Sequence, residues 1–509
     1  MTNEENNEIA SNNEMASRAD KMQAIKTHDS VVFKDNFDRT HKISEILKKY
    51  PEIQEIPEGT ESFVKIAGRV MSIRVHGKLA FVDLKDYYGK IQIAFKSDVL
   101  GEETFDYFIK SADMGDFIGV EGDCFFTQKG MLTVLVKKFV FLSKSLRPLP
   151  SGFYSIADVE KRYRQRYLDL IANDESMNIF KMRYKLVQEI RNFLIEKDFV
   201  EVVTRILQPQ AGGAMAKPFH THHNALDHDF ALRISPELDL KMAIVGGFDR
   251  VFEFATNFRN EGIDPSHLQE FQMLEWYCAY KNYKQNMEWT EEMMKKVIPA
   301  VLGKGVFTIN DRKGNPCEID MGKPFRVVTF SDLLKEVGVD IFAEKEDLIE
   351  KALDCGITEE EVNARSRGNL IDDIYKKLVR PNLIQPTFIT AYPSDILPLA
   401  RVNDEDPRLS DSYQLLIGTW EIVKAYSELT DPVQQRKALE DQAKEKANGD
   451  EEAMQVDEEF LTAMEHGLPP VTGCGIGIDR LITVITGQSN LRDTVLFPLM
   501  KPDEGYDYI

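Results

Sequence analysis

The sequence has few cysteines, no long apolar run and no basic-then-apolar segment at its amino terminus. Its five cysteines are odd in number, widely spaced and without a Cys-x-x-Cys pair. This usage is typical of a reducing compartment and argues against a thiolate metal site. No segment approaches the roughly 20 apolar residues that a membrane-spanning helix requires. These absences predict a cytoplasmic protein that is not inserted in a membrane.

Basic residues are scarce relative to acidic ones, and the formal net charge is −21 over 509 residues. This balance argues against non-specific nucleic-acid binding, but a local basic patch can still bind one specific RNA. The composition, 43% hydrophobic and 29% charged, is that of an ordinary globular protein. The length is sufficient for two or more domains with their own cores.

The first 145 residues divide into three segments by pattern. Residues 1–30 are rich in Asn, Glu, Ser and Lys and are predicted to form a disordered tail. Residues 31–58 are predicted to form short helices. Residues 59–145 alternate between apolar and polar side chains in five short runs, with a helical piece around Thr104–Ala112. Five strands with that interruption predict an OB-fold barrel, a fold that binds single-stranded nucleic acid by stacking bases on exposed rings.

Residues 146–170 are predicted to be a linker, because prolines mark their first half. The second half carries the densest basic cluster of the chain: Lys161, Arg162, Arg164 and Arg166. Such a cluster fits either contacts to RNA phosphates or a solvated, salt-bridged helix face.

Residues 171–509 are predicted to form one α+β domain. Apolar residues at helical spacing predict a long helix near its start, followed by the strand FVEVVT: Ile179, Met182, Leu186, Ile190 and Phe193. Residues 331–380 are predicted to be a mainly helical insertion packed on this domain.

The segment 247–280 alternates in two runs joined by a polar loop, which predicts a hairpin. One face would carry Val251, Glu253, Ala255, Asn257 and Arg259 from the first strand, and Phe271, Met273, Glu275, Tyr277 and Ala279 from the second.

Several side chains of this hairpin suit ligand binding. Arg259 offers planar donors for a phosphate or carboxylate, and Phe271 offers a ring on which a base can stack. Glu261 can accept a hydrogen bond from an amine, and Glu275 with Tyr277 can hold a cationic group. The alternative, an amphipathic hairpin with solvated charges and core aromatics, explains the whole string poorly.

Two further segments carry candidate site residues. In GTWEIVKAYSEL, ideal alternation places Lys424, Tyr426 and Glu428 on one strand face and Glu421 on the other. In GCGIGIDR, glycines would allow the backbone to approach a ligand closely, and Arg480 could bind a phosphate.

Four histidines, at 220, 222, 223 and 228, invite a zinc interpretation. Their spacing fits neither a helical His-x-x-x-His pair nor a standard zinc finger. No zinc site is therefore predicted.

Asn257–Gly262 followed by Glu270-Phe271 resembles motif 2 of the class II aminoacyl-tRNA synthetases, and GCGIGIDR resembles their motif 3. The helix and strand after residue 173 resemble motif 1, which forms the dimer interface in that family. The flanking residues are most similar to those of divergent, bacterial-type lysine enzymes. The resemblance covers nearly all of residues 40–502.

The resemblance implies an α+β architecture: an OB-fold anticodon-binding domain, then a catalytic domain whose antiparallel sheet is flanked by helices. It implies a ligase that forms lysyl-adenylate from lysine and ATP and transfers the lysyl group to tRNA. The implied partners are ATP, lysine, tRNA and a second copy of the chain, and the implied cofactor is Mg²⁺.

Family matching also implies residue roles. Arg259 and Arg480 would be catalytic and would bind ATP together with Glu261, His267 and Phe271. The amino acid would be bound by Gly213, Glu237, Arg259, Glu275, Tyr277 and Glu428. Phe81 and Gln92 would contact the anticodon. Glu421 matches a Mg²⁺ ligand, and the family's other metal carboxylate falls at Gln414. Because Glu421 and Glu428 cannot share a pocket on a regular strand, an irregularity is predicted between them.

Several positions depart from the family pattern: Met131, Arg205, Asp239, Leu397, Gln414, Val423, Lys424 and Ala425. They leave two alternatives to an active lysine enzyme. One is a catalytically silent tRNA-binding relative, and the other is a related synthetase for another amino acid. A close diamino acid analogue of lysine also remains open as the substrate. Modification of a protein lysine is disfavoured, because the barrel is present.

Overall fold

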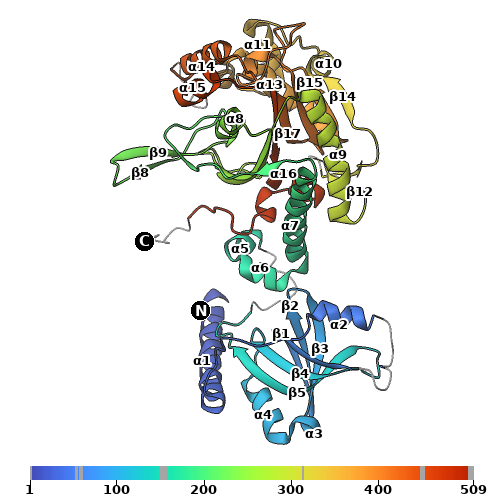
Figure 1. The fold of residues 1–509 in the computed structure, drawn as a ribbon. Coiled ribbons are helices and arrows are strands. Elements are labelled where there is room, and N and C mark those ends of the chain that lie inside the picture. Colours follow the sequence, from blue (N-terminus) through green and yellow to red (C-terminus); the bar gives the residue numbers. More distant parts are fainter. Residues whose placement is uncertain are drawn as a thin grey trace. The chain divides into compact units, whose positions relative to one another are not determined.

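The computed structural model describes residues 3–51, 56, 61–149, 158–311, 314–447 and 453–502. It divides into two units, Met1–Tyr154 and Ser155–Ile509 (Figure 1). Part of the predicted linker, residues 150–157, lies outside the described residues, as do residues 52–55 and 57–58 of the predicted amino-terminal helices. None of the described helices is long and apolar enough to cross a membrane.

The first unit is a closed barrel with the strand order β1-β2-β3-β5-β4. Its strands are β1 (Phe63–His76), β2 (Leu79–Asp86), β3 (Gly89–Lys96), β4 (Phe117–Phe126) and β5 (Leu132–Ser143). Helix α2 (Ile43–Lys49) precedes β1, and α3 (Ser97–Leu100) and α4 (Glu102–Ser111) connect β3 to β4. Alternate strand residues such as Ile66, Val82 and Val134 are fully buried inside the barrel. This architecture confirms the predicted OB fold.

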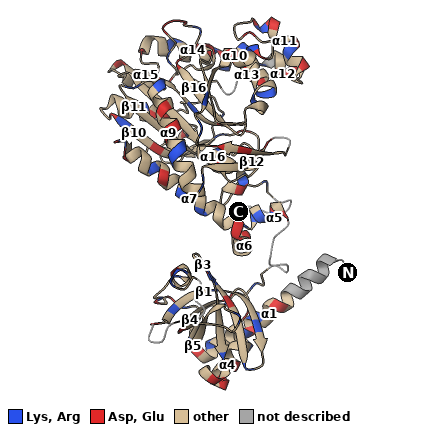
Figure 2. Ribbon diagram, turned by 90° about the vertical axis from the view of Figure 1, so that its right-hand side faces the viewer, with Lys and Arg blue, Asp and Glu red and all other residues tan. Residues whose placement is uncertain are grey.

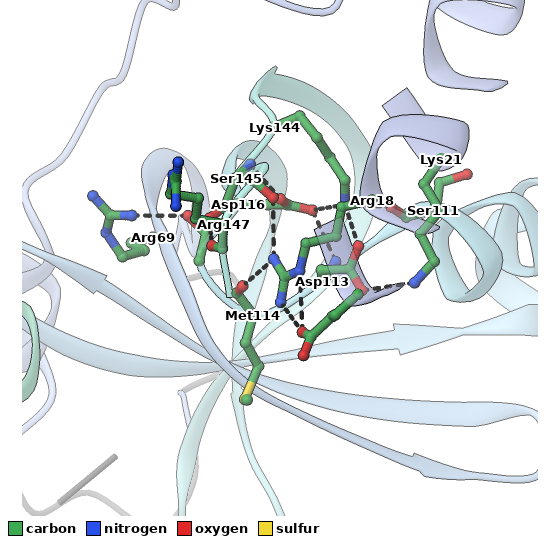
Figure 3. A network of polar contacts seen from close by, with 12 residues as sticks. Arg18, Lys21, Arg69, Ser111, Asp113, Met114, Asp116, Lys144, Ser145 and Arg147 are labelled. Carbon is green, nitrogen blue, oxygen red and sulfur yellow. Dashed lines mark hydrogen bonds and ion pairs between the residues drawn. The ribbon is translucent and has the colours of Figure 1, made fainter. Parts of the chain in front are cut away.

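The predicted disordered tail is instead a helix, α1 (Asn3–Asp29). Ile25 on α1 is fully buried against the barrel. Arg18 is 3% exposed and donates to the backbone carbonyls of Met114 and Ser145 (Figure 3). Lys21 pairs with Asp113, which also contacts the buried Lys144. Composition alone missed this helix because its stability comes from contacts with residues about 90 to 130 positions away.

The second unit is built on an eight-stranded sheet of order β14-β15-β16-β17-β18-β11-β10-β6. Its strands are β6 (Val200–Glu201), β10 (Arg250–Phe258), β11 (Glu270–Ala279), β14 (Arg326–Thr329), β15 (Thr387–Thr390), β16 (Ser412–Ile417), β17 (Trp420–Ser427) and β18 (Val471–Gly477). Pairing is antiparallel except for the two edge pairs, β14 with β15 and β10 with β6. The predicted hairpin is β10 and β11, with Glu253 opposite Glu275 and Asn257 opposite Phe271. Smaller sheets are formed by β7 (Leu207–Gln208), β8 (His220–His223) and β9 (His228–Leu232), and by β12 (Val306–Asn310) and β13 (Pro316–Asp320).

Helices cover the sheet in layers. On one face, α7 (Asp174–Ile195), α9 (Tyr283–Leu302) and α16 (Ile478–Ile485) share a core with the sheet. Toward the other face lie α8 (Glu237–Val245) and α15 (Glu458–Glu465), which pack together beside α14 (Pro432–Ala447). The predicted insertion is α10 (Phe330–Lys335), α11 (Lys345–Asp354), α12 (Glu359–Ala364) and α13 (Arg367–Leu378), with a core of its own.

The second half of the predicted linker belongs to the second unit, as α5 (Val159–Arg164) and α6 (Arg166–Ala172). Arg166 is fully buried, pairs with Asp169 and donates to the Leu496 carbonyl. Arg162 also pairs with Asp169, and Arg164 pairs with Glu160. These arginines are salt-bridged within the second unit, but Arg166 is buried rather than on a solvated helix face. Elsewhere too, acidic and basic residues are interspersed along the helices (Figure 2).

Candidate active site

A cavity of about 280 Å³ lies on the sheet face opposite α9. Strands β11, β17 and β18 contribute to its floor because alternate residues of each strand point away from the core, and Arg259, which directly follows β10, lies at its rim. The cavity brings together most of the predicted site residues: Gly213, Glu237, Arg259, Glu261, His267, Phe271, Glu275, Tyr277, Glu421 and Arg480. Glu253 shares the face of Glu275 but does not line the cavity, because it pairs with buried Arg233.

One end of the cavity, here called the acidic end, is formed by Glu237, Glu275, Tyr277 and Tyr426. Glu275 is 3% exposed and accepts hydrogen bonds from the Ser235 hydroxyl at 2.9 Å and the Tyr277 hydroxyl at 3.1 Å. Burial, with the nearby Glu237 carboxylate, raises the pKa of Glu275 to about 8. A buried carboxylate of this kind is stabilised in its charged form by an incoming cation.

Glu237, in the first turn of α8, is held by two neighbours. The Lys241 ammonium donates to its Oε1 at 2.7 Å, and the Tyr426 hydroxyl donates to both carboxylate oxygens, at 2.7 and 2.9 Å. The sequence signal for Lys241 was its i+4 spacing from Glu237 on a helix. Neither Lys241 nor Tyr426 was among the predicted site residues.

Glu428 was predicted to bind the substrate directly, but it does not line the cavity. It is 2% exposed and forms an ion pair with Lys241, which is itself fully buried. Burial alone would lower the pKa of Lys241, but Glu237 and Glu428 outweigh it and raise the pKa. In this structure Glu428 therefore contacts Lys241 and does not face the cavity.

Gly473 on β18 separates Tyr277 from Glu428. A Cβ atom at this position would lie 2.3 Å from both Glu428 Oε1 and Tyr277 Cε1. The glycine of the GCGIGIDR segment is therefore required for the packing of the acidic end.

The other end of the cavity, here called the arginine end, contains Arg259, Phe271 and Arg480. The Arg259 guanidinium lies 5.0 Å from the centre of the Phe271 ring. Its Nε has no hydrogen-bond partner among the described residues, and burial lowers the pKa of Arg259. Arg480, in the first turn of α16, donates to the Glu421 carbonyl at 3.4 Å. Two guanidinium groups beside a flat ring can bind a nucleotide phosphate chain and its base.

The predicted irregularity between Glu421 and Glu428 is present. Val423 pairs with Leu415 on β16, and Glu421 pairs with the next residue, Leu416, which leaves Ile422 as the extra residue of a bulge. The bulge lets Glu421 and Lys424 both line the cavity. Gln414 does not line it: its amide oxygen accepts a hydrogen bond from Tyr392 at 2.8 Å.

Two of the departures from the family pattern compensate each other. Arg205 pairs with Asp239 at 3.2 Å, and also with Glu459 at 2.8 Å. Gln414 and Lys424, two further departures, are neighbours on the paired strands β16 and β17. Leu397 is buried at the cavity wall, in the core of the insertion. Met131 is exposed at the end of the barrel strand pair β4 and β5.

A polar connection beneath the arginine end was not predicted from the sequence. Arg183 on α7 pairs with Asp479, and the other Asp479 oxygen accepts from the Gln272 backbone at 2.7 Å. Asp479 directly precedes Arg480 in the chain, and Gln272 directly follows Phe271. The contact between Asp479 and Gln272 therefore fixes the backbone next to Arg480 and Phe271.

The remaining predicted residues lie outside this cavity. The four histidines belong to the exposed β8–β9 hairpin. Among the described residues, no cluster of three or more His, Cys, Asp or Glu side chains suited to a metal was found. In the first unit, Phe81 on β2 and Gln92 on β3 point to the same face, since Phe81 pairs with Ala94 and Gln92 with Asp83.

Residues 158–501 match the family of class II tRNA synthetases (D, K and N), and residues 64–142 match the OB-fold nucleic acid binding domain. The chain belongs to the class II tRNA synthetase family. A lysine--tRNA ligase of Lactococcus lactis subsp. cremoris is 43% identical over 495 residues, covering 96% of this chain and 99% of the relative. Lysine--tRNA ligases of Yersinia enterocolitica and Histophilus somni are each 42% identical; they cover 96% and 97% of this chain, and 97% and 98% of their own lengths.

In this member of the class II tRNA synthetase family, four segments bring the cavity residues together. The hairpin β10–β11 and the β18–α16 junction supply Arg259, Phe271 and Arg480. The β17 bulge and the start of α8 supply Glu421 and Glu237.

Proposed function

We propose that this chain activates lysine with ATP to form lysyl-adenylate and transfers the lysyl group to the 3′ end of tRNA(Lys). One observation carries the proposal: a single cavity has buried carboxylates at one end and two arginines beside an aromatic ring at the other. Relatives named lysine--tRNA ligase, matched over nearly the whole chain, support the same reaction.

In this proposal the acidic end binds the amino acid. Glu275 and Tyr277 receive the side-chain ammonium, and Glu237 with Gly213 receives the α-amine. Glu428 acts behind them, through Lys241. A substrate that lacks the second ammonium would leave the buried Glu275 carboxylate without a cation, which opposes its binding.

The arginine end would bind ATP. The adenine would stack on Phe271, with Glu261 accepting from its amine and His267 contacting the phosphates. Arg259 would bind the α-phosphate and the amino acid carboxylate together, and Arg480 would bind the terminal phosphate. Because the reaction joins two bound substrates, positioning and neutralisation of charge supply most of the catalysis.

Mg²⁺ fits this donor set through a single carboxylate, Glu421, since Mg²⁺ commonly takes one or two carboxylates with the phosphates of its substrate. When bound, it would offset the negative charge of the triphosphate. Gln414 does not fit a ligand role, because its amide oxygen is directed to Tyr392.

The first unit would bind the anticodon, with a base stacked on Phe81 and another read by Gln92. A second copy of the chain would cover an exposed apolar strip around β6 and β7, formed by Ile195, Val200, Val203, Ile206 and Leu207. A cytoplasmic location, as predicted above, suits such an enzyme.

Lysine-dependent exchange of labelled pyrophosphate into ATP tests the proposal, with each common amino acid assayed in parallel. We expect exchange with lysine, with Glu275→Gln and Arg259→Ala each losing at least about a hundredfold in kcat/KM. If folded protein binds tRNA but supports no exchange with any amino acid, the chain is a silent relative, an alternative motivated by Gln414 and Lys424.

A further inference from the structure

Ser235 lies between the two carboxylates that we propose bind the amines of the substrate. It lines the cavity, is 3% exposed and is two residues before Glu237. Its hydroxyl donates to Glu275 Oε1 at 2.9 Å and accepts from the backbone N–H of Glu237 at 3.1 Å. One side chain therefore connects the start of α8 to β11, the strand that carries Glu275.

The Glu237 N–H fixes the direction of both hydrogen bonds. A backbone N–H can only donate, so the Ser235 oxygen accepts there, and its single proton remains for Glu275. The Tyr277 hydroxyl donates to the second carboxylate oxygen of Glu275, Oε2, at 3.1 Å. Each oxygen of Glu275 therefore has one hydroxyl donor, and donors to a carboxylate favour its charged form.

The close packing around Ser235 keeps its hydroxyl in place. A Cβ atom at Gly213 would lie 3.3 Å from both Cβ and Oγ of Ser235, and 3.1 Å from Glu237 Cβ. Gly213 has a φ of 81°, a conformation that favours glycine. The loop that carries Gly213 therefore packs directly on Ser235 and restricts the rotation of its side chain.

Charged and polar groups from several elements act on Glu275. Burial raises the pKa of Glu275 to about 8, with a further contribution from the Glu237 carboxylate, whereas the hydroxyls of Ser235 and Tyr277 and the Arg259 guanidinium lower it. The other titratable groups nearby come from α8, from β17 and the residue after it, and from β18: Lys241, Lys424, Tyr426, Glu428 and Cys474. Ser235 has no contact with a ligand in the proposed function, so its effect on Glu275 can be measured separately.

We propose that Ser235 is a positioning residue that holds the Glu275 carboxylate charged and oriented for the side-chain ammonium, and so extends lysine binding to lower pH. The inference rests on the proposed function, because it requires that ammonium to bind at Glu275. Without the Ser235 proton, the Glu275 carboxyl becomes charged only at a higher pH, and lysine binding then requires that higher pH.

The test measures lysine binding by calorimetry on the full chain at about pH 7 and at about pH 9.5, below and above the pKa of Glu275. The variants are Ser235→Ala, which removes the hydroxyl, and Ser235→Cys, which replaces it with a weaker donor. Ser489→Ala is the matched control, since Ser489 is exposed. ATP binding is measured on each variant, and thermal unfolding checks that each is folded.

We expect Ser235→Ala to weaken lysine binding about three- to tenfold at about pH 7 and less than about twofold at about pH 9.5. These losses correspond to a rise of about 0.5–1 unit in the pKa of Glu275, the size expected for one lost hydrogen bond. Ser235→Cys should show a smaller loss with the same pH dependence, and Ser489→Ala should show none. ATP binding should stay within about twofold throughout. At about pH 8.5, lysine binding to Ser235→Ala should release more protons than lysine binding to the unmodified chain.

A loss of lysine affinity that is equal at the two pH values would indicate a structural role alone and would overturn the inference. No loss at either pH, or an equal loss of ATP affinity, would also overturn it, and each of these results leaves the proposed function intact. If Ser235→Ala does not fold, the same comparison on Ser235→Cys decides. If the unmodified chain binds neither lysine nor ATP, the proposed function itself is wrong and the inference is lost with it.

Discussion

The Tyr426 hydroxyl donates to both carboxylate oxygens of Glu237, at 2.7 and 2.9 Å. The two residues come from β17 and α8 and meet at the acidic end of the cavity. The contact fixes the orientation of the Glu237 carboxylate, which we propose binds the α-amine of the substrate. It also supplies a hydrogen-bond donor to a buried charge.

Replacing Tyr426 by Phe is therefore expected to destabilise the protein by about 1–2 kcal/mol, since a hydrogen bond to a buried charged group is lost. Lysine binding should weaken several-fold, because Glu237 is no longer oriented. Denaturant unfolding and calorimetry measure both effects. Tyr167→Phe is the control, because Tyr167 is 56% exposed. Unchanged stability in Tyr426→Phe would contradict the contact.

The raised pKa of Glu275, about 8, predicts a pH dependence. Below this pH the carboxyl is largely neutral, whereas a bound ammonium requires the carboxylate. Lysine binding should therefore tighten as the pH rises from 6.5 to 8.5 and should release close to one proton at about pH 7. Calorimetry in buffers of different ionisation enthalpy measures this release, and Glu275→Gln should abolish it.

The same group affects the stability of the ligand-free protein. The pKa of Glu275 is about 8 in the folded protein, against an ordinary value of 4.5. Between pH 4.5 and pH 8 the folded state therefore binds more protons than the unfolded state. The Glu275 contribution to the free energy of unfolding should fall as the pH rises from 4.5 to 8. Glu275→Gln should show a smaller fall over this window than the unmodified chain.

Lys241 is expected to be essential for stability. Lys241→Met would leave Glu237 and Glu428 buried without their shared cation, and breaking such a pair by removing one partner costs about 3–5 kcal/mol. Unfolding free energies for Lys241→Met, Glu428→Gln and the double variant should show that the double loss is smaller than the sum of the single losses. Strict additivity would mean that the pair is not coupled.

Gly473→Ala is expected to displace Glu428 or Tyr277, because its Cβ would lie 2.3 Å from an atom of each. We expect a loss of more than about 2 kcal/mol in stability and a lysine affinity reduced by at least tenfold. Gly305→Ala is the matched control, since the nearest atom to its Cβ would be Pro299 Cγ at 3.9 Å. Thermal unfolding and calorimetry distinguish the two variants.

Phe81→Ala should separate the functions of the two units. Stacking of one base on an aromatic ring contributes about 1–3 kcal/mol, so tRNA affinity should fall at least about fivefold. Lysine-dependent pyrophosphate exchange without tRNA should stay unchanged, because Phe81 lies in the first unit and the cavity in the second. Val99→Ala, at an exposed position of α3, serves as the control.

Local patterns in the sequence were sufficient for much of the fold. Alternation along β1–β5 predicted the barrel, and alternation along β10 and β11 placed Glu275 and Tyr277 on one face. Helical spacing predicted α7, whose residues Leu186 and Ile190 are fully buried. These predictions succeeded because a strand or helix with one buried face repeats its pattern every two residues or every 3.6.

Contacts between distant segments were decided by the tertiary structure alone. The register of β17 against β16 placed Glu421 in the cavity through the Ile422 bulge. The packing of α8 brought Lys241 against Glu428, and Arg205 met Asp239. Helix α1 is held by the carbonyls of Met114 and Ser145. The sequence by itself determined which side chains share a face. The partner of each buried charge depended on the packing of segments far apart in the chain, because no local repeat encodes a contact made only when those segments meet.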